Sequence, residues 1–114
     1  MLLHAEAKRL TLPACTETMV QRIVDGFDPL KIILFGSYAR GEANRHSDVD
    51  LLVVFDSVEN KHETTIEILG QLSDMPVAKD VVVATSEDIK EYGDLVGYVF
   101  RPALRDGKVL YEQS

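Results

Sequence analysis

The sequence has little cysteine, no excess of basic residues and no long apolar run, and each shortage excludes a class of protein. Cys15 is the only cysteine among 114 residues, so an intrachain disulfide and a cysteine-based zinc site are excluded and a reducing compartment is expected. Lys and Arg number 12 against 19 Asp and Glu, a net charge of −7 that argues against duplex DNA or RNA as a partner. A basic protein partner suits this charge better.

The chain also lacks the sequence features of secretion and of membrane insertion. Its N-terminus has neither the charged start nor the apolar run of a signal peptide. No apolar stretch approaches the ~20 residues that a membrane-spanning helix needs. We therefore expect a cytoplasmic protein with no membrane contact, folded as a single domain over residues 1–114 around one core.

Hydrophobic periodicity predicts helices and strands in a mixed order. Helical spacing predicts helices over 14–27, 64–72 and 93–105, another that begins at Ser86, and a short one over 37–40. Runs of β-branched and aromatic residues predict strands over 31–35, 48–55, 77–85 and 108–111. Residues 1–12 are only weakly patterned. The order predicts an α+β fold in which helices flank a mixed sheet.

Two carboxylates stand at the start of the second predicted strand. Asp48 and Asp50 are spaced i, i+2, so in a strand their side chains point to the same face. The turn at Gly36 and Ser37 follows the preceding strand and offers backbone N–H groups and a hydroxyl. Neighbouring carboxylates repel each other unless a cation lies between them, and Mg²⁺ binds one or two carboxylates together with phosphate oxygens. The pattern indicates a site for a metal ion and a nucleoside triphosphate.

A third carboxylate, Asp80, precedes the apolar run 81–84. A carboxylate in such a strand is costly to bury unless it is paired or binds metal. Asp80 either completes a cluster with Asp48 and Asp50, or is a solvated residue at a strand edge or paired with Lys79. The pair at the turn favours the cluster.

Three further residues in this region have two interpretations each. Arg40 either reaches a phosphate as a planar donor or pairs with Glu42. Ser47 either orients Asp48 through a local hydrogen bond or is a plain turn serine. His46 is interpreted as a solvated loop residue rather than a ligand, because no spaced partner accompanies it.

The complete pattern is Gly-Ser-x-Ala-Arg-Gly over 36–41, Ser-Asp-x-Asp-Leu over 47–51 and the later Asp80. It resembles the minimal nucleotidyltransferases of the DNA polymerase beta-like superfamily, and the resemblance covers most of the chain. This likeness implies the minimal polymerase beta-like nucleotidyltransferase fold. It also implies transfer of a nucleoside monophosphate, with release of pyrophosphate.

The resemblance assigns roles to residues already singled out. It implies two Mg²⁺ ions held by the three aspartates, with Asp80 as the candidate base. It implies a triphosphate, ATP by analogy, gripped by Gly36 and Ser37. Arg40 and Ser47 join these two residues as candidates for binding the nucleotide.

The same family implies a protein partner. Its members are commonly encoded beside a small helical ribonuclease of the HEPN type, and they act as antitoxins that transfer AMP onto a toxin tyrosine. Larger relatives add a second domain that completes the acceptor site, so here a hetero-oligomer or a homodimer is expected to supply that pocket.

Two other functions stay open at this point. One is an antitoxin that neutralises its toxin by binding alone. The other is a transferase acting on a small molecule or an RNA 3′ end, although the charge of −7 argues against RNA.

Overall fold

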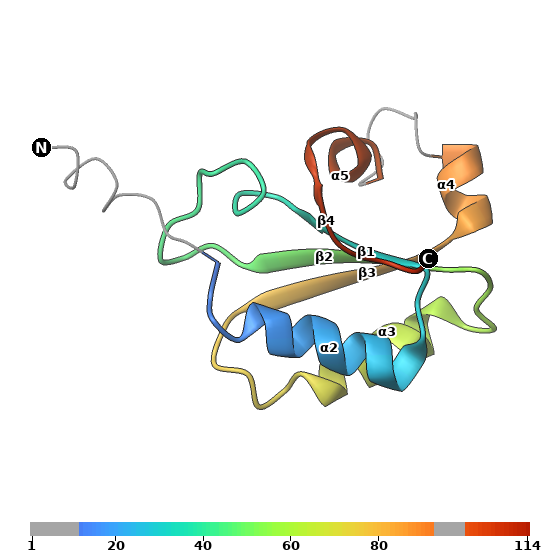
Figure 1. Cartoon of the computed structure of the whole chain (residues 1–114), viewed down its shortest axis with the longest axis horizontal. Helices are drawn as coiled ribbons and strands as arrows, with labels where there is room; N and C mark the ends of the chain where they lie inside the picture. Colours follow the sequence, from blue (N-terminus) through green and yellow to red (C-terminus); the bar gives the residue numbers. More distant parts are fainter. Residues whose placement is uncertain (1–11, 93–99) are drawn as a thin grey trace, which may run out of the picture.

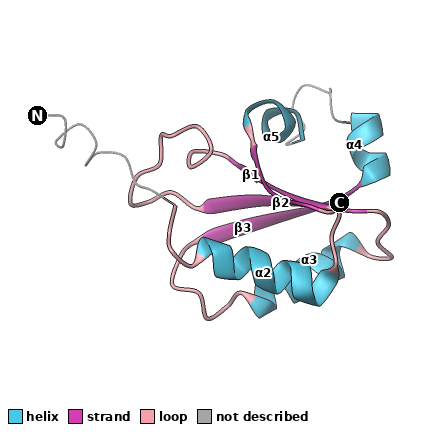
Figure 2. Ribbon diagram, in the orientation of Figure 1, coloured by secondary structure: helices cyan, strands magenta, loops and turns pink. Residues whose placement is uncertain are grey.

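In a computed structural model, residues 12–92 and 100–114 are described and form one four-stranded sheet with helices on both faces. The helices are α2 (Thr16–Phe27), α3 (Lys61–Gln71), α4 (Ser86–Tyr92) and α5 (Phe100–Asp106). The strands are β1 (Lys31–Phe35), β2 (Val49–Phe55), β3 (Lys79–Thr85) and β4 (Lys108–Glu112). Figure 1 shows α2 and α3 below the sheet and α4 and α5 above it. Figure 2 shows the same two helical layers by secondary structure.

The sheet is mixed, as the sequence predicts. Its strand order is β3-β2-β1-β4. β1 runs antiparallel to both β2 and β4, whereas β2 and β3 are parallel. A parallel pair needs a crossover connection, and α3 provides it.

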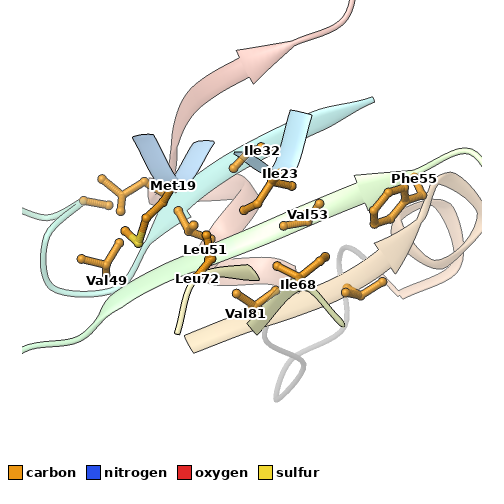
Figure 3. Packing of buried hydrophobic residues seen from close by; sticks show 13 residues of the cluster. Met19, Ile23, Ile32, Val49, Leu51, Val53, Phe55, Ile68, Leu72 and Val81 are labelled. Carbon is orange, nitrogen blue, oxygen red and sulfur yellow. The ribbon is translucent and has the colours of Figure 1, made fainter. Parts of the chain in front are cut away.

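Both faces of the sheet are packed against helices. The larger cluster lies on the α2 and α3 side and includes Met19, Ile23, Leu51, Val53, Ile68 and Val81 (Figure 3). The smaller cluster on the opposite side is Ile33, Leu52, Val54, Ala84 and Ala103, the last from α5. Residues of β2 thus alternate between the two clusters, which explains why this central strand is apolar almost throughout.

Local signals set where the helices begin and end. α2 ends because Asp28 adopts a left-handed conformation (φ 52°) and Pro29 follows. α3 starts at Lys61, earlier than the predicted residue 64. The Asn60 side chain caps it by accepting a hydrogen bond of 3.0 Å from the Glu63 N–H.

The short helix predicted over 37–40 is wrong, because the segment forms consecutive turns. The Gly36 carbonyl accepts hydrogen bonds from the N–H groups of Ala39 and Arg40. Gly41 then takes a positive φ of 71°, which stops the helical path after one turn. The predicted 93–105 helix is seen as α5 from Phe100 onward, while its positions 93–99, like the weakly patterned residues 1–11, lie outside the described residues.

Within 12–92 and 100–114, every helix is too short or too polar to cross a membrane.

Candidate active site

The parallel pair β2 and β3 brings two of the predicted carboxylates side by side. Asp50 is aligned with Asp80 in the ladder, and Asp48 precedes Asp50 by two residues. Asp50 continues the set of β2 side chains, Leu52 and Val54, that face α5. Equivalent positions on neighbouring strands share a face, so Asp80 points the same way. β2 and β3 begin at the same end of the sheet, next to the 36–48 loop (Figure 1), and the register places Asp50 and Asp80 at this end.

The three carboxylates differ in exposure. Asp50 is half-buried, whereas Asp48 and Asp80 are exposed. β3 is an edge strand, so Asp80 is a solvated residue at a strand edge, and its register opposite Asp50 is compatible with the cluster interpretation as well. Pairing with Lys79 does not hold, because the Lys79 ammonium donates to the carbonyls of Met75 and Val77 at 3.2 and 3.1 Å.

Charge repulsion is concentrated on Asp50. Burial raises the pKa of its carboxyl, and the charges of Asp80 and Asp48 raise it further. The nearby Arg40 guanidinium opposes these effects and lowers the same pKa. The charges of Asp48 and Asp80 therefore act on Asp50, and the cation site predicted there stays a prediction.

Gly36 is fitted closely against Asp50. Its φ of 76° lies in the region that favours glycine, and a Cβ added there would overlap the Oδ2 atom of Asp50. The register explains this contact, because Phe35, the last residue of β1, is aligned with Asp50. The turn thus brings backbone against the carboxylate, a position where a side chain has no room.

The turn continues into a compact loop. The Ser37 carbonyl accepts a hydrogen bond of 2.9 Å from the Glu42 N–H, which folds the chain back over the Gly-Ser turn. The Ser37 side chain is half-buried beside it. Ser37 therefore lies in the same compact turn as Gly36, and its role in binding a nucleotide stays a prediction.

Arg40 pairs with Glu42 in this structure. Its Nε lies 2.8 Å from the Glu42 Oε1, and this hydrogen bond raises the pKa of the guanidinium, with smaller contributions from Asp106 and Asp50. Arg40 is therefore paired within its own loop, and the charges of Asp106, at the end of α5, and of Asp50 act on it as well. The presence of Asp106 here was not predicted, because 66 residues separate it from Arg40 and only the packed fold joins them.

Ser47 closes the loop rather than orienting Asp48. Its Oγ accepts a hydrogen bond of 2.9 Å from the Asn44 N–H, and its own N–H donates to the Asn44 carbonyl at 3.0 Å. The plain turn interpretation therefore describes Ser47 here. His46 is an exposed loop residue, as expected, with its backbone N–H bonded to the Asn44 side chain.

The donor set fits Mg²⁺ in kind but is not converged. Three carboxylates beside a turn rich in backbone N–H groups are the ligands that Mg²⁺ and a triphosphate use together. Burial and the charges of Asp80 and Asp48 raise the pKa of Asp50, and a cation nearby would favour its charged form. Yet no group of three or more His, Cys, Asp or Glu side chains in the described ranges is close enough together to hold a metal ion.

Comparisons with known sequences give a consistent result. The Nucleotidyltransferase domain family matches residues 17–105. A candidate protein adenylyltransferase of Methanocaldococcus jannaschii is 35% identical over 82 residues, 71% of this chain and 77% of that protein. Another from the same organism is 50% identical over 66 residues, 49% of this chain. That match spans 45% of the second relative, so the chain corresponds to less than half of its length.

Solved structures share the fold. A candidate nucleotidyltransferase of Sulfolobus solfataricus aligns with a TM-score of 0.60 at 20% identity, over 85% of this chain and 77% of that one. A mutant of the toxin–antitoxin MntA–HpeT aligns with a TM-score of 0.62 at 22% identity, over 86% and 72%. A toxin–antitoxin structure with AMP-PNP aligns with a TM-score of 0.54 at 22% identity, over 87% and 75%.

Proposed function

The chain belongs to the nucleotidyltransferase domain family, and from that premise we propose that it transfers AMP from ATP to a hydroxyl group of a protein acceptor. One observation carries the proposal: Asp50 and Asp80 are aligned on one face of the sheet, and the backbone of Gly36 packs against Asp50. The Methanocaldococcus relatives, candidate protein adenylyltransferases, support a protein as the acceptor.

Different residues of the chain are proposed to bind the triphosphate, to hold the metal ions and to accept the proton. Backbone N–H groups of the turn and the Ser37 hydroxyl bind the triphosphate, and Arg40, on exchange of its Glu42 partner for phosphate, adds a planar donor. Mg²⁺ ions held by Asp48, Asp50 and Asp80 would neutralise the triphosphate and lower the pKa of the attacking hydroxyl. Ser47 holds the loop that leads into Asp48.

The transfer is a displacement at the α-phosphorus. The acceptor oxygen forms a bond to that phosphorus, the bond to the β-phosphate oxygen breaks, and pyrophosphate leaves. The hydroxyl proton passes to Asp80, which is exposed and therefore reachable by a bulky acceptor. Positioning and charge neutralisation supply the acceleration.

We propose further that the acceptor is a toxin and that this chain is its antitoxin, with a tyrosine of a HEPN-type ribonuclease as the target. The fold it shares with a protein of the MntA–HpeT toxin–antitoxin supports this partner class. The net charge of −7 suits a basic protein partner.

The test uses purified protein, Mg²⁺ and α-labelled ATP, with and without the protein encoded beside it. Label is expected on the neighbouring protein, with a loss of at least about 100-fold in Asp50→Asn, since one misplaced group at a reacting centre costs that much. The matched control is Asp56→Asn, an exposed aspartate just past the far end of β2, which should label at the normal rate.

Two results would decide against the proposal. Full labelling by Asp50→Asn would show that the transfer does not require the carboxylate cluster. No label, together with a stable complex that silences the neighbour, would establish an antitoxin that acts by binding alone.

A further inference from the structure

The ion pair between Arg40 and Glu42 lies on the loop that continues from the Gly36–Ser37 turn. The Arg40 Nε is 2.8 Å from the Glu42 Oε1. The Arg40 N–H donates to the Gly36 carbonyl at 3.2 Å, and the Glu42 N–H donates to the Ser37 carbonyl at 2.9 Å. The backbone therefore holds one positive and one negative residue at the turn that is proposed to bind the triphosphate.

Glu42 carries a charge that opposes phosphate binding. Its carboxylate repels a triphosphate, and it engages a guanidinium whose planar set of donors suits phosphate. The hydrogen bond from Arg40 to Glu42 is the largest of the effects that raise the pKa of the guanidinium, ahead of the charges of Asp106 and Asp50. The carboxylate thus accepts the same kind of charge-assisted hydrogen bond that a phosphate oxygen would accept.

The ion pair is of a kind that a stronger anion can displace. The Arg40 side chain is 45% exposed and that of Glu42 is 65% exposed, and water screens such pairs so that they contribute little. Within residues 12–92 and 100–114, Arg40 is the one partner that the Glu42 side chain has. The side chain can therefore turn away while the backbone hydrogen bond to Ser37 stays in place.

We propose that Glu42 competes with the triphosphate for Arg40. Its carboxylate holds the guanidinium until a phosphate group replaces it, and it binds the guanidinium again when pyrophosphate leaves. This competition rests on the proposed function, because it takes the turn as the triphosphate site. Glu42 then lowers the affinity for nucleotide and for pyrophosphate alike, and it favours release of the product after each transfer.

Two other roles of Glu42 would have different effects. A residue that only positions Arg40 for phosphate would strengthen binding, so its removal would weaken the binding of nucleotide. A residue that repels the triphosphate directly would act whether or not Arg40 is present. Only competition gives tighter binding that requires Arg40.

A double-mutant cycle separates these roles. The measurement is isothermal titration calorimetry of the full chain with Mg²⁺ and an ATP analogue that has a methylene group between its α- and β-phosphorus atoms. Glu42→Gln should bind the analogue about three- to five-fold more tightly, in line with the contribution of an exposed ion pair. Arg40→Gln should bind it about ten-fold less tightly, because a charge-assisted hydrogen bond is lost. Adding Glu42→Gln to Arg40→Gln should change the affinity by less than about two-fold.

Inorganic pyrophosphate gives a second measurement. In a competition titration with Mg²⁺, its dissociation constant should fall in Glu42→Gln by the same factor as that of the analogue. The matched control is Glu67→Gln, which removes the same charge from an exposed position on α3, on the other face of the sheet from α5 (Figure 1). Glu67→Gln should bind both ligands as the wild type does. Far-UV circular dichroism and thermal unfolding of each variant serve as the folding control.

Each outcome decides between the competition and the proposed transfer. Unchanged or weaker binding by Glu42→Gln would overturn the competition, and so would an equal gain with and without Arg40. Either result would leave the transfer intact, because labelling of the acceptor is measured separately. A wild type that binds no analogue would overturn both proposals, whereas one that binds it but labels no protein would contradict the transfer alone.

Discussion

At the scale of single residues, Gly36 is the position where the smallest change should have the largest effect. Gly36→Ala places a methyl group on the Asp50 carboxylate and forces alanine into a positive φ. We expect a loss of about 1–2 kcal/mol in the free energy of unfolding and a fall of about 100-fold in transfer rate. Chemical denaturation and initial rates measure the two effects.

Gly41→Ala is the matched control for this substitution. Gly41 also has a positive φ, of 71°, but nothing lies within 4 Å of an added Cβ. It should lose a similar amount of stability and keep most of its activity. Equal activity losses in the two variants would show that backbone strain, not contact with Asp50, is responsible.

Asp50 should make the stability of the metal-free protein depend on pH. Its folded pKa is raised, so the folded state binds the proton more tightly than the unfolded state does. That stabilisation is complete below the ordinary pKa of about 3.9 and is lost as pH rises through the folded value. Asp50→Asn should therefore raise Tm by a few degrees at pH 7 with EDTA present, and by much less near pH 3.5.

Differential scanning fluorimetry at the two pH values measures this difference, with Asp56→Asn as the control at an exposed site. A variant that is less stable than the wild type at pH 7 would contradict the repulsion inferred for Asp50.

The sequence predicted which residues lie in the turn and at the start of β2 better than it predicted their contacts. Asp48, Asp50, Gly36 and Ser37 follow from spacing along the chain, because a strand and a turn fix their directions. The partners of Arg40 and Ser47 depend on how one loop folds over itself, and several arrangements satisfy the same residues. Sequence alone therefore left both residues with two interpretations.

At the scale of elements, strands and helices with a strong apolar pattern were predicted well. β1 has the predicted bounds, and α2 ends where Asp28 and Pro29 indicate. Errors arose where a hydrogen bond rather than hydrophobicity decides, as at the Asn60 cap and in the turns over 37–40. β3 begins at Lys79 instead of residue 77, a smaller error at the end of an element.

The start of α4 offers a prediction at this scale. Thr85 and Asp88 form a reciprocal cap: the Asp88 N–H donates to the Thr85 hydroxyl at 3.1 Å, and the Asp88 carboxylate accepts from the Thr85 N–H at 3.0 Å. Lys61, from α3, donates to the same carboxylate at 2.6 Å. Asp88→Ala should lower the free energy of unfolding by about 1–2 kcal/mol.

The effect should depend on pH with the opposite sign to that of Asp50. Burial alone would raise the pKa of Asp88, but the hydrogen bonds from Lys61 and Thr85 hold it below its usual value. Its stabilisation is thus present above about pH 3.9 and is lost as pH falls through the folded value. Urea denaturation at pH 7 and pH 3 measures it, and Glu91→Ala, exposed on the same helix, should change little at either.

At the scale of the whole molecule, the sequence favoured Asp80 as a neighbour of Asp50, but the parallel register that aligns the two residues could not be predicted from it. Thirty residues separate the two, and only the parallel pairing of β2 with β3 across α3 brings them together. The sequence favoured a cluster of Asp80 with Asp48 and Asp50 but could not give the register that sets Asp80 opposite Asp50. Strand order is a property of the folded sheet, not of any segment.

Binding of nucleotide should stabilise the whole fold. A ligand that binds only the folded state adds about 2.7 kcal/mol at 100 times its dissociation constant. Mg²⁺ with a non-hydrolysable ATP analogue should therefore raise Tm clearly in the wild type and much less in Asp48→Asn. An equal rise in both would place the nucleotide elsewhere, and the analogue with EDTA separates the contribution of the metal.

With Asp80 in the role proposed above, the parallel ladder between β2 and β3 also makes the transfer reaction a check on strand register. If β3 slipped by one residue against β2, Asp80 would turn from the α5 face to the α3 face, because side chains alternate along a strand. Helix and strand content would hardly change, so circular dichroism would report a normal fold. Refolded protein with a normal circular dichroism spectrum but a reduced rate of transfer would therefore contain molecules with the wrong strand register. The loss of rate would measure their fraction, which secondary-structure content does not reveal.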